Sequence, residues 1–331
     1  MSDSSRRFVD REFTEPKVAM SACLELEQCR YNGQSIPDSF IRRLLPHVEL
    51  TPICPEVEIG LGVPRDTIRL VDDDGRTRLV QPSTDEDLTD DMDAFAASFL
   101  RDAGTLDGWI LKSGSPTCGP KDVKVYGAAS NAPTVRTEPG QFARHVLDED
   151  GELAVESEGR LRNYPIRHHF LTRLFSFAEL RNLRQNPSVS DLVDFQRRHK
   201  HLLMTYDQEG MRELGRIAAN PDGEPPDALY AHYRDRFHAA LAGRPERGDY
   251  INTFQHMYGH FKEELSATER EEFDSMLDEY RAHRLPLHAL LALVRSWVSR
   301  FEYEYFADQS FLEPYPRELV QMRDSGKGVD F

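Results

Sequence analysis

Apolar runs and helix-type periods alternate along the first half of the chain. Runs bounded by Pro, Gly or charged residues predict strands, and Asp-Asp-Asp-Gly between two alternating runs predicts a hairpin. The predicted strands cover residues 17–22, 48–53, 107–113 and 123–126, and the hairpin covers 66–82. Amphipathic periods between them predict helices over 38–45, 85–103 and 140–147. This order is typical of an α/β domain with a small, mostly parallel sheet and flanking helices.

The hydrophobic pattern changes after residue 165, where strand-like alternation stops and long helical periods begin. These periods predict helices over 168–182, 190–205, 208–219, 228–242, 250–265, 267–283 and 285–306. Ser266-Ala-Thr-Glu269 is a capping-box pattern that marks the start of one of them. The sequence therefore predicts a polar, disordered tail over 1–15, an α/β domain over 16–165 and an all-α helical bundle domain over 166–331.

The overall charge is strongly negative, with 41 Lys and Arg against 57 Asp and Glu, a net charge of −16. Such a charge argues against a protein coated in basic surface for nucleic acid. No apolar run approaches the ~18 residues that span a bilayer, so no membrane partner is expected. The polar N-terminus lacks the apolar core of a signal peptide, and we expect a cytoplasmic protein. In that compartment a disulfide is the weaker interpretation of the cysteines.

One segment departs from this charge balance. Between Arg160 and His201 there are nine Lys and Arg against three acids. A local phosphate-binding face is one interpretation, and a solvated helix face is the alternative. The candidate RNA-binding residues are Arg162, Arg167, Arg173, Arg181, Arg184, Arg197, Arg198 and Lys200.

All four cysteines lie within the first 118 residues, so they form a candidate functional set. Cys23 and Cys54 follow predicted strands, and Cys118 lies in the Gly/Ser/Pro loop after a third. The carboxyl ends of parallel strands meet at one edge of a sheet, where ligands bind. The spacing matches neither zinc fingers nor ferredoxins, but it suits an iron–sulfur cluster or zinc held by the tertiary fold. The alternative is a set of ordinary buried cysteines.

Two polar residues stand close to these cysteines in the sequence. Glu56 follows Cys54 by two residues, so it is a candidate to activate water or carry a proton. A surface carboxylate or a helix-start residue is the alternative. Ser113 ends the third predicted strand and is a candidate to hydrogen-bond substrate, with a simple cap as the alternative.

Five ordered motifs across residues 16–165 resemble the thiouracil desulfidase family. They are Ser21-Ala-Cys-Leu24, Cys29-Arg-Tyr-Asn-Gly33, Cys54-Pro-Glu56, Gly62-Val-Pro-Arg65 and Leu111-Lys-Ser-Gly-Ser-Pro-Thr-Cys-Gly119. Leu26, Glu27 and Asn32 depart from the family's usual residues in the first loop. The resemblance implies a [4Fe–4S] cluster held by Cys23, Cys54 and Cys118, with Cys29 near the site but not a ligand. It also implies that Glu56 and Ser113 are the catalytic residues.

The helical half resembles a second family, the YbgA-like domain. The residues that carry the likeness are Phe195-Gln-Arg-Arg-His-Lys-His-Leu-Leu-Met204, Gln255-His-Met-Tyr-Gly-His-Phe-Lys262, Leu285-Pro286 and Pro314-Tyr-Pro316. The fused arrangement resembles the RudS-type tRNA 4-thiouridine desulfidases. It implies non-redox conversion of 4-thiouridine in tRNA to uridine, with the sulfur captured by the open iron and released as sulfide. Two alternatives are a desulfidase of free thiouracil or thionucleosides, and a non-enzymatic, metal-containing nucleic-acid-binding stress protein.

Overall fold

Two compact units make up the part of the chain that the computed structural model describes, which is residues 11–130, 132–185 and 187–321. One unit is Glu15–Leu174 together with Gln321, and the other is Phe175–Val320 together with residues 11–14. The division falls inside one helix, α5 (Tyr164–Leu183), whereas the sequence predicted it before residue 166. The α/β class of the first unit and the all-α class of the second are confirmed.

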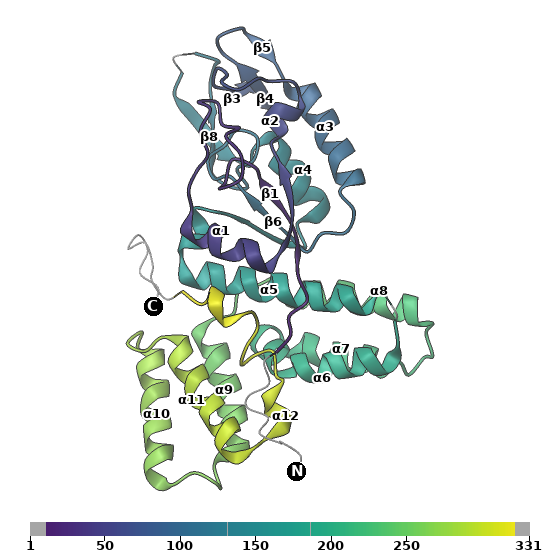
Figure 1. The fold of residues 1–331 in the computed structure, drawn as a ribbon, viewed down its shortest axis with the longest axis vertical. Coiled ribbons are helices and arrows are strands. Elements are labelled where there is room, and N and C mark those ends of the chain that lie inside the picture. Colours follow the sequence, from purple (N-terminus) through teal and green to yellow (C-terminus); the bar gives the residue numbers. More distant parts are fainter. Residues whose placement is uncertain (1–10, 131, 186, 322–331) are drawn as a thin grey trace. The chain divides into compact units, whose positions relative to one another are not determined.

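A four-stranded parallel sheet carries the first unit. Its strands are β1 (Lys17–Ser21), β2 (Glu49–Ile53), β6 (Gly108–Leu111) and β9 (Ala154–Ser157), in the order β2-β1-β6-β9. The three strands predicted to precede the cysteines are therefore neighbours, and β1 and β6 lie side by side in Figure 1. Both are almost completely buried, as expected for parallel strands covered on their faces. The sequence missed β9, because Ala-Val-Glu-Ser is too short and polar to form an apolar run.

A second, mixed sheet has the order β5-β4-β3-β7-β8. Its strands are β3 (Arg69–Asp73), β4 (Arg76–Gln81), β5 (Glu86–Asp87), β7 (Val123–Tyr126) and β8 (Thr134–Glu138). β3 and β4 form the predicted hairpin, and Asp74 and Gly75 take the positive φ angles that such a turn requires. β7 begins shortly after the loop that carries Cys118, so the sheet anchors the far end of that loop.

Two amphipathic helices, α3 (Thr89–Asp102) and α4 (Gln141–Asp150), pack against these sheets in one core. Trp109 of β6 and Phe142 of α4 are fully buried, with ring centroids 6.0 Å apart in an edge-to-face contact. The Trp109 Nε1–H donates to Asp150 Oδ2 at 2.9 Å, so the indole's polar atom is satisfied. Shorter helical segments are α1 (Ser39–Leu44), α2 (Pro55–Glu58) and the 3-10 turns Leu45–His47 and Arg160–Arg162.

The second unit is built from helices packed around aromatic cores. They are α6 (Val189–Tyr206), α7 (Gln208–Ala218), α8 (Pro226–Ala240), α9 (Arg247–Phe261), α10 (Ala267–Arg281), α11 (Leu287–Phe301) and α12 (Glu304–Ala307), followed by a 3-10 turn at Arg317–Leu319. The predicted capping box at Ser266 is confirmed at the start of α10. The single helix predicted over 285–306 is wrong, because Glu302 adopts a left-handed conformation (φ 55°) that ends α11.

Part of the predicted tail over 1–15 is packed, and residues 1–10 lie outside the described residues. Arg11 donates to Glu179 Oε2 and to the Glu313 carbonyl, and Phe13 makes an edge-to-face contact with Phe175. These contacts fix the chain on the helical unit just before β1 begins. Within the described residues, none of the helices combines the length and apolar character needed to cross a membrane.

Candidate active site

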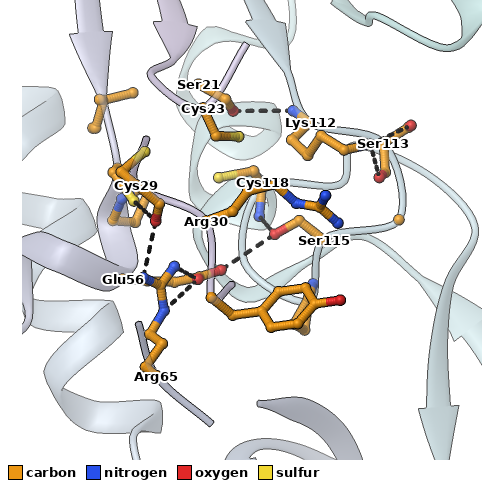
Figure 2. A pocket seen from close by; sticks show the side chains of 16 residues that line it. Ser21, Cys23, Cys29, Arg30, Glu56, Arg65, Lys112, Ser113, Ser115 and Cys118 are labelled. Atoms are coloured by element: carbon orange, nitrogen blue, oxygen red, sulfur yellow. Dashed lines mark hydrogen bonds and ion pairs between the residues drawn. The ribbon is translucent and has the colours of Figure 1, made fainter. Parts of the chain in front are cut away.

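The carboxyl ends of β1, β2 and β6 meet around one cavity. The Lys112 N–H donates to Ser21 Oγ at 3.0 Å, which ties the end of β6 to the end of β1. The cavity has a volume of about 210 Å³, and its walls come from the loops that follow these three strands. Figure 2 shows its lining side chains, in which thiol, carboxylate, guanidinium and hydroxyl groups face a common space. A convergence of this kind at the end of a parallel sheet is typical of a binding site.

All four cysteines line this cavity as free thiols. Cys29 and Cys118 are buried, Cys23 and Cys54 are half-buried, and Cys54 Sγ lies 3.8 Å from the Cys29 carbonyl oxygen. The predicted convergence of Cys23, Cys54 and Cys118 is therefore observed, and Cys29 lies with them.

The thiol pKa values follow from this burial and crowding. Loss of solvent raises the pKa of Cys118 to about 12, and the hydrogen bond with Cys23 is the main cause that raises the pKa of Cys29 to about 11. The hydrogen bond with Cys29 raises the pKa of Cys54 as well. Metal binding at these thiols has to release their protons, because the thiolate is the ligand.

This donor set fits an iron–sulfur cluster in its chemistry. Thiolates are the usual protein ligands of such clusters, and these four come from three strand-end loops around one cavity, with Cys23 and Cys29 on the same loop. Over the described ranges, no group of three or more His, Cys, Asp or Glu side chains is arranged to hold a single metal ion. Cys29 lines the same cavity as the three predicted ligands. The set of three cysteine ligands, with Cys29 outside it, therefore stays a prediction.

The loop that carries Cys118 is held by its own hydrogen bonds and by α4. The Cys118 N–H donates to Ser115 Oγ at 3.1 Å, and the Ala143 N–H at the start of α4 donates to the Thr117 carbonyl at 2.9 Å. Gly140 allows this close approach, because a Cβ there would lie 2.5 Å from the Thr117 oxygen. The thiol is thus presented from a rigid turn, which is what a fixed ligand position requires.

Glu56 lies in the first turn of α2, two residues after the N-cap Cys54, and both of its carboxylate oxygens are engaged. Oε2 pairs with the guanidinium of Arg65, and Oε1 accepts from Thr117 Oγ1 at 2.7 Å. Arg65 also donates to the Cys29 carbonyl at 2.9 Å, and only 5% of its side chain is exposed. Figure 2 shows Glu56 between Arg65 and Ser115, beside the cysteines. Arg65 is not among the predicted site residues, although it ends the motif Gly62-Val-Pro-Arg65.

Ser113 lies at the same cavity and is held by a second buried carboxylate, Glu158. Glu158 accepts from the Ser113 N–H and the Ser113 hydroxyl, both at 2.7 Å, and from Lys112 Nζ at 2.6 Å. Burial alone would raise the pKa of Glu158, but the donors of Lys112 and Ser113 outweigh it and hold that pKa below its usual range. The sequence missed this network, because Glu158 follows the strand β9 that the pattern did not predict.

The basic segment is not a single exposed face. Arg167 is 2% exposed and donates to the Leu161 carbonyl at 2.6 Å, and Arg173 is 9% exposed and donates to the Glu152 carbonyl at 2.8 Å. This corrects the expectation for these two residues, because phosphate cannot reach guanidinium groups that are buried on backbone carbonyls. Long arginine side chains serve this structural role as readily as a surface one.

The other basic candidates differ in how far their charge is compensated. Arg197 pairs with Asp308, and Arg198 pairs with Glu179. The Arg162 guanidinium lies 3.5 Å from Asp38 Oδ2. Arg181 is half-buried, whereas Arg184 and Lys200 are exposed. An RNA-binding role of these six residues stays a prediction.

Fold and site together define an α/β domain with a thiol-lined cavity beside a fixed carboxylate, followed by a helical domain. Residues 18–158 match the family described as 2-thiouracil desulfurase, and residues 200–316 match a family described as a protein of unknown function, DUF1722. The chain therefore belongs to the 2-thiouracil desulfurase family and carries a fused YbgA-like domain. Both resemblances found in the sequence are confirmed.

Individual relatives match either half of the chain. The uncharacterized protein YbgA of Escherichia coli (strain K12) is 27% identical over 158 residues, which are 47% of this chain and 93% of that protein. The uncharacterized protein YbbK of Bacillus subtilis (strain 168) is 30% identical over 109 residues, which are 31% of this chain and 72% of that protein. A solved structure titled [4Fe-4S]-dependent thiouracil desulfidase TudS is 28% identical and covers 44% of this chain and 93% of its own, with a TM-score of 0.35.

Proposed function

We propose that this protein is a desulfidase that replaces the sulfur of a thiocarbonyl pyrimidine with oxygen from water, and that its substrate is 4-thiouridine in tRNA. One observation carries the proposal: four thiols and an immobilised carboxylate line the same cavity, at the strand ends of a domain of the 2-thiouracil desulfurase family. Soft sulfur ligands and a proton acceptor side by side are what removal of a thiocarbonyl sulfur requires.

The cofactor of this proposal is a [4Fe–4S] cluster, which Cys23, Cys54 and Cys118 would hold. When bound, such a cluster with one iron free of protein ligands supplies a Lewis acid with affinity for the substrate's sulfur. The residues on the chain supply the rest of the reaction. They bind the pyrimidine, hold the water and move its proton.

Glu56 is the proton acceptor in this scheme. Arg65 and Thr117 fix the carboxylate, so it holds a water molecule in one orientation. The water oxygen forms a bond to the thiocarbonyl carbon while Glu56 takes one of the two water protons. The carbon–sulfur bond then breaks with its electron pair on sulfur, and the second proton passes from the new hydroxyl to the departing sulfur. Water, thiocarbonyl and the Glu56 carboxylate thus give carbonyl, hydrosulfide and protonated Glu56, and no electron donor or acceptor is needed.

Lys112 and Ser113 bind the pyrimidine's polar edge, and Glu158 positions both of them. Replacing Glu158 by Gln removes the counter-charge of Lys112 and leaves one donor of the network poorly paired. The value of kcat/KM is expected to fall about 10–100-fold, the effect of losing one charge-assisted hydrogen bond. The measurement is steady-state kinetics on a protein that retains its circular dichroism spectrum.

The matched control is Glu86→Gln, at an exposed glutamate of the same domain. It is expected to behave as wild type, and Glu158→Asp is expected to restore part of the turnover. If Glu158→Gln loses thermal stability together with turnover, and Glu158→Asp restores neither of them, Glu158 would have a structural role alone.

The tRNA substrate is the finer part of the proposal. A YbgA-like domain follows the desulfidase domain in this chain. This fused arrangement resembles the RudS-type tRNA 4-thiouridine desulfidases, and the resemblance supports a tRNA substrate. Arg184 and Lys200 are exposed on that domain and are candidates to contact phosphate. A base inside folded tRNA has to be extruded before its sulfur can reach the cavity. The family description favours a second candidate, free 2-thiouracil, which needs no extrusion from folded RNA.

The deciding experiment compares substrates with anaerobically reconstituted protein. Thiolated tRNA, 4-thiouracil and 2-thiouracil are incubated separately, and the remaining thionucleoside or thiobase is measured by chromatography together with the sulfide released. Loss of 4-thiouridine from tRNA, faster than loss of either free base, is the expected result. If every substrate is recovered unchanged from protein with its full iron and sulfide content, the desulfidase proposal is wrong.

A further inference from the structure

The cationic side chains that line the cavity differ in whether a carboxylate neutralises them. Arg30, Arg65 and Lys112 all contribute to the lining. Arg65 is neutralised by Glu56 and Lys112 by Glu158. Within residues 11–130, 132–185 and 187–321, no carboxylate pairs with Arg30. Its positive charge is therefore the one in this lining that remains available to an anion.

Tyr31 stands next to Arg30 in the lining and is 42% exposed, one of the few large apolar side chains to be so among the described residues. The Arg30 guanidinium carbon lies 5.2 Å from the centroid of the Tyr31 ring. Stacking of this kind orients a guanidinium and leaves its N–H groups free to donate. In the view of Figure 2, the Arg30 side chain extends across the cavity between Cys118 and Ser115.

The backbone on both sides of this pair is fixed. The Gly33 N–H donates to the Arg30 carbonyl at 2.9 Å, and the Arg65 N–H donates to the Tyr31 carbonyl at 2.8 Å. Gly33 has a φ of +68°, so the turn depends on a glycine at that position. The backbone that carries the two side chains is thus fixed at the cavity before any ligand arrives, which lowers the entropy cost of binding.

We propose that Arg30 and Tyr31 form a nucleotide-binding rim on the cavity. Arg30 binds a phosphate of the substrate, and Tyr31 stacks with its free face on the substrate's pyrimidine. A guanidinium and an aromatic ring are the groups with which proteins bind phosphate and unstacked bases. The proposal rests on the desulfidase function and assigns the phosphate contact and the base contact of its substrate to these two residues, whether that substrate is a free nucleotide or RNA.

The test separates the phosphate from the base. Wild-type protein, Arg30→Ala and Tyr31→Ala are assayed on 4-thiouracil, 4-thiouridine, 4-thiouridine 3′,5′-bisphosphate and thiolated tRNA. Arg30→Ala is expected to lose about tenfold in kcat/KM on the bisphosphate and to keep its activity on the base and the nucleoside, the effect of one lost ionic hydrogen bond. Tyr31→Ala is expected to raise KM about tenfold on all four substrates, because each of them presents a base to stack.

Matched variants and a binding measurement complete the design. Arg76→Ala removes one exposed positive charge from the same domain and is expected to change nothing, and Tyr31→Phe is expected to retain the stacking. Calorimetric affinity for uridine 3′,5′-bisphosphate, relative to uridine, is expected to fall only in Arg30→Ala.

The outcomes distinguish a failure of the rim proposal from a failure of the desulfidase function on which it rests. If wild-type protein consumes none of the four substrates, the desulfidase function itself fails. If it consumes them and Arg30→Ala loses equally on the base and the bisphosphate, or loses nothing, the rim proposal is overturned. A loss on both the free nucleotide and tRNA means that the rim binds phosphate within RNA, and a loss confined to the free nucleotide means that it serves mononucleotides.

Discussion

Replacing Glu56 by Gln is expected to lower kcat by about 10²–10⁴-fold, the range of a single general base. The amide has nearly the same shape and keeps one acceptor oxygen, but it cannot take a proton from water. Iron content and visible absorbance should stay at the wild-type level, because Glu56 is not among the predicted ligands. The measurement is pre-steady-state turnover on thiolated tRNA, together with iron and sulfide analysis of the same sample.

The same helix offers the control for this variant. Glu58 is exposed on α2, two residues beyond Glu56, and Glu58→Gln is expected to behave as wild type. A Glu56→Gln protein that turns over at the wild-type rate would exclude Glu56 as the proton acceptor. A variant that loses its iron instead would make Glu56 part of the metal site.

Replacing Cys118 by Ala is expected to remove both the bound iron and the turnover. The thiol is 5% exposed and is presented from a loop that Ser115 and α4 hold in place, so its removal takes away one of the three predicted ligands from a fixed position. The change is small enough in volume for the domain to stay folded. Iron and sulfide content, visible absorbance and thermal unfolding of the anaerobically purified variant measure these effects.

Cys29→Ala is the control that tests whether the loss of iron is specific to the predicted ligands. It removes a buried thiol of the same cavity, and the three-cysteine ligand set predicts that it keeps its iron. Full iron content in Cys118→Ala would contradict the ligand set. Loss of iron in both variants would bring Cys29 into it.

The sequence predicted the features that depend on short stretches of chain. β1 and β6 are buried strands, so each appears as an apolar run, whereas β2 is an edge strand that ends at the buried Ile53. The cysteines that follow these strands are visible as strand-end residues. Parallel pairing then brings the strand ends together, whatever the length of chain between them. The convergence of Cys23, Cys54 and Cys118 could therefore be predicted from the pattern.

The features that the sequence missed depend on partners distant along the chain. Glu158 is a site residue only because β9 places it against Ser113, 45 residues earlier. Arg167 and Arg173 cannot be told from surface arginines by composition, since the carbonyls that bury them are set by the tertiary fold. Arg30 differs from Arg65 and Lys112 in having no counter-charge among the described residues, and this difference becomes visible only when the pairs of Arg65 and Lys112 are known.

The dispersal of the thiols over three strand-end loops has a consequence for how the protein matures. Cys118 is positioned by β6 in the sheet and by α4 against its loop, so we expect the complete set of thiols to assemble only once the chain extends through residue 150. In zinc fingers the metal folds the peptide. Here the packing of the α/β domain brings the thiols together, so we expect folding to precede cofactor loading.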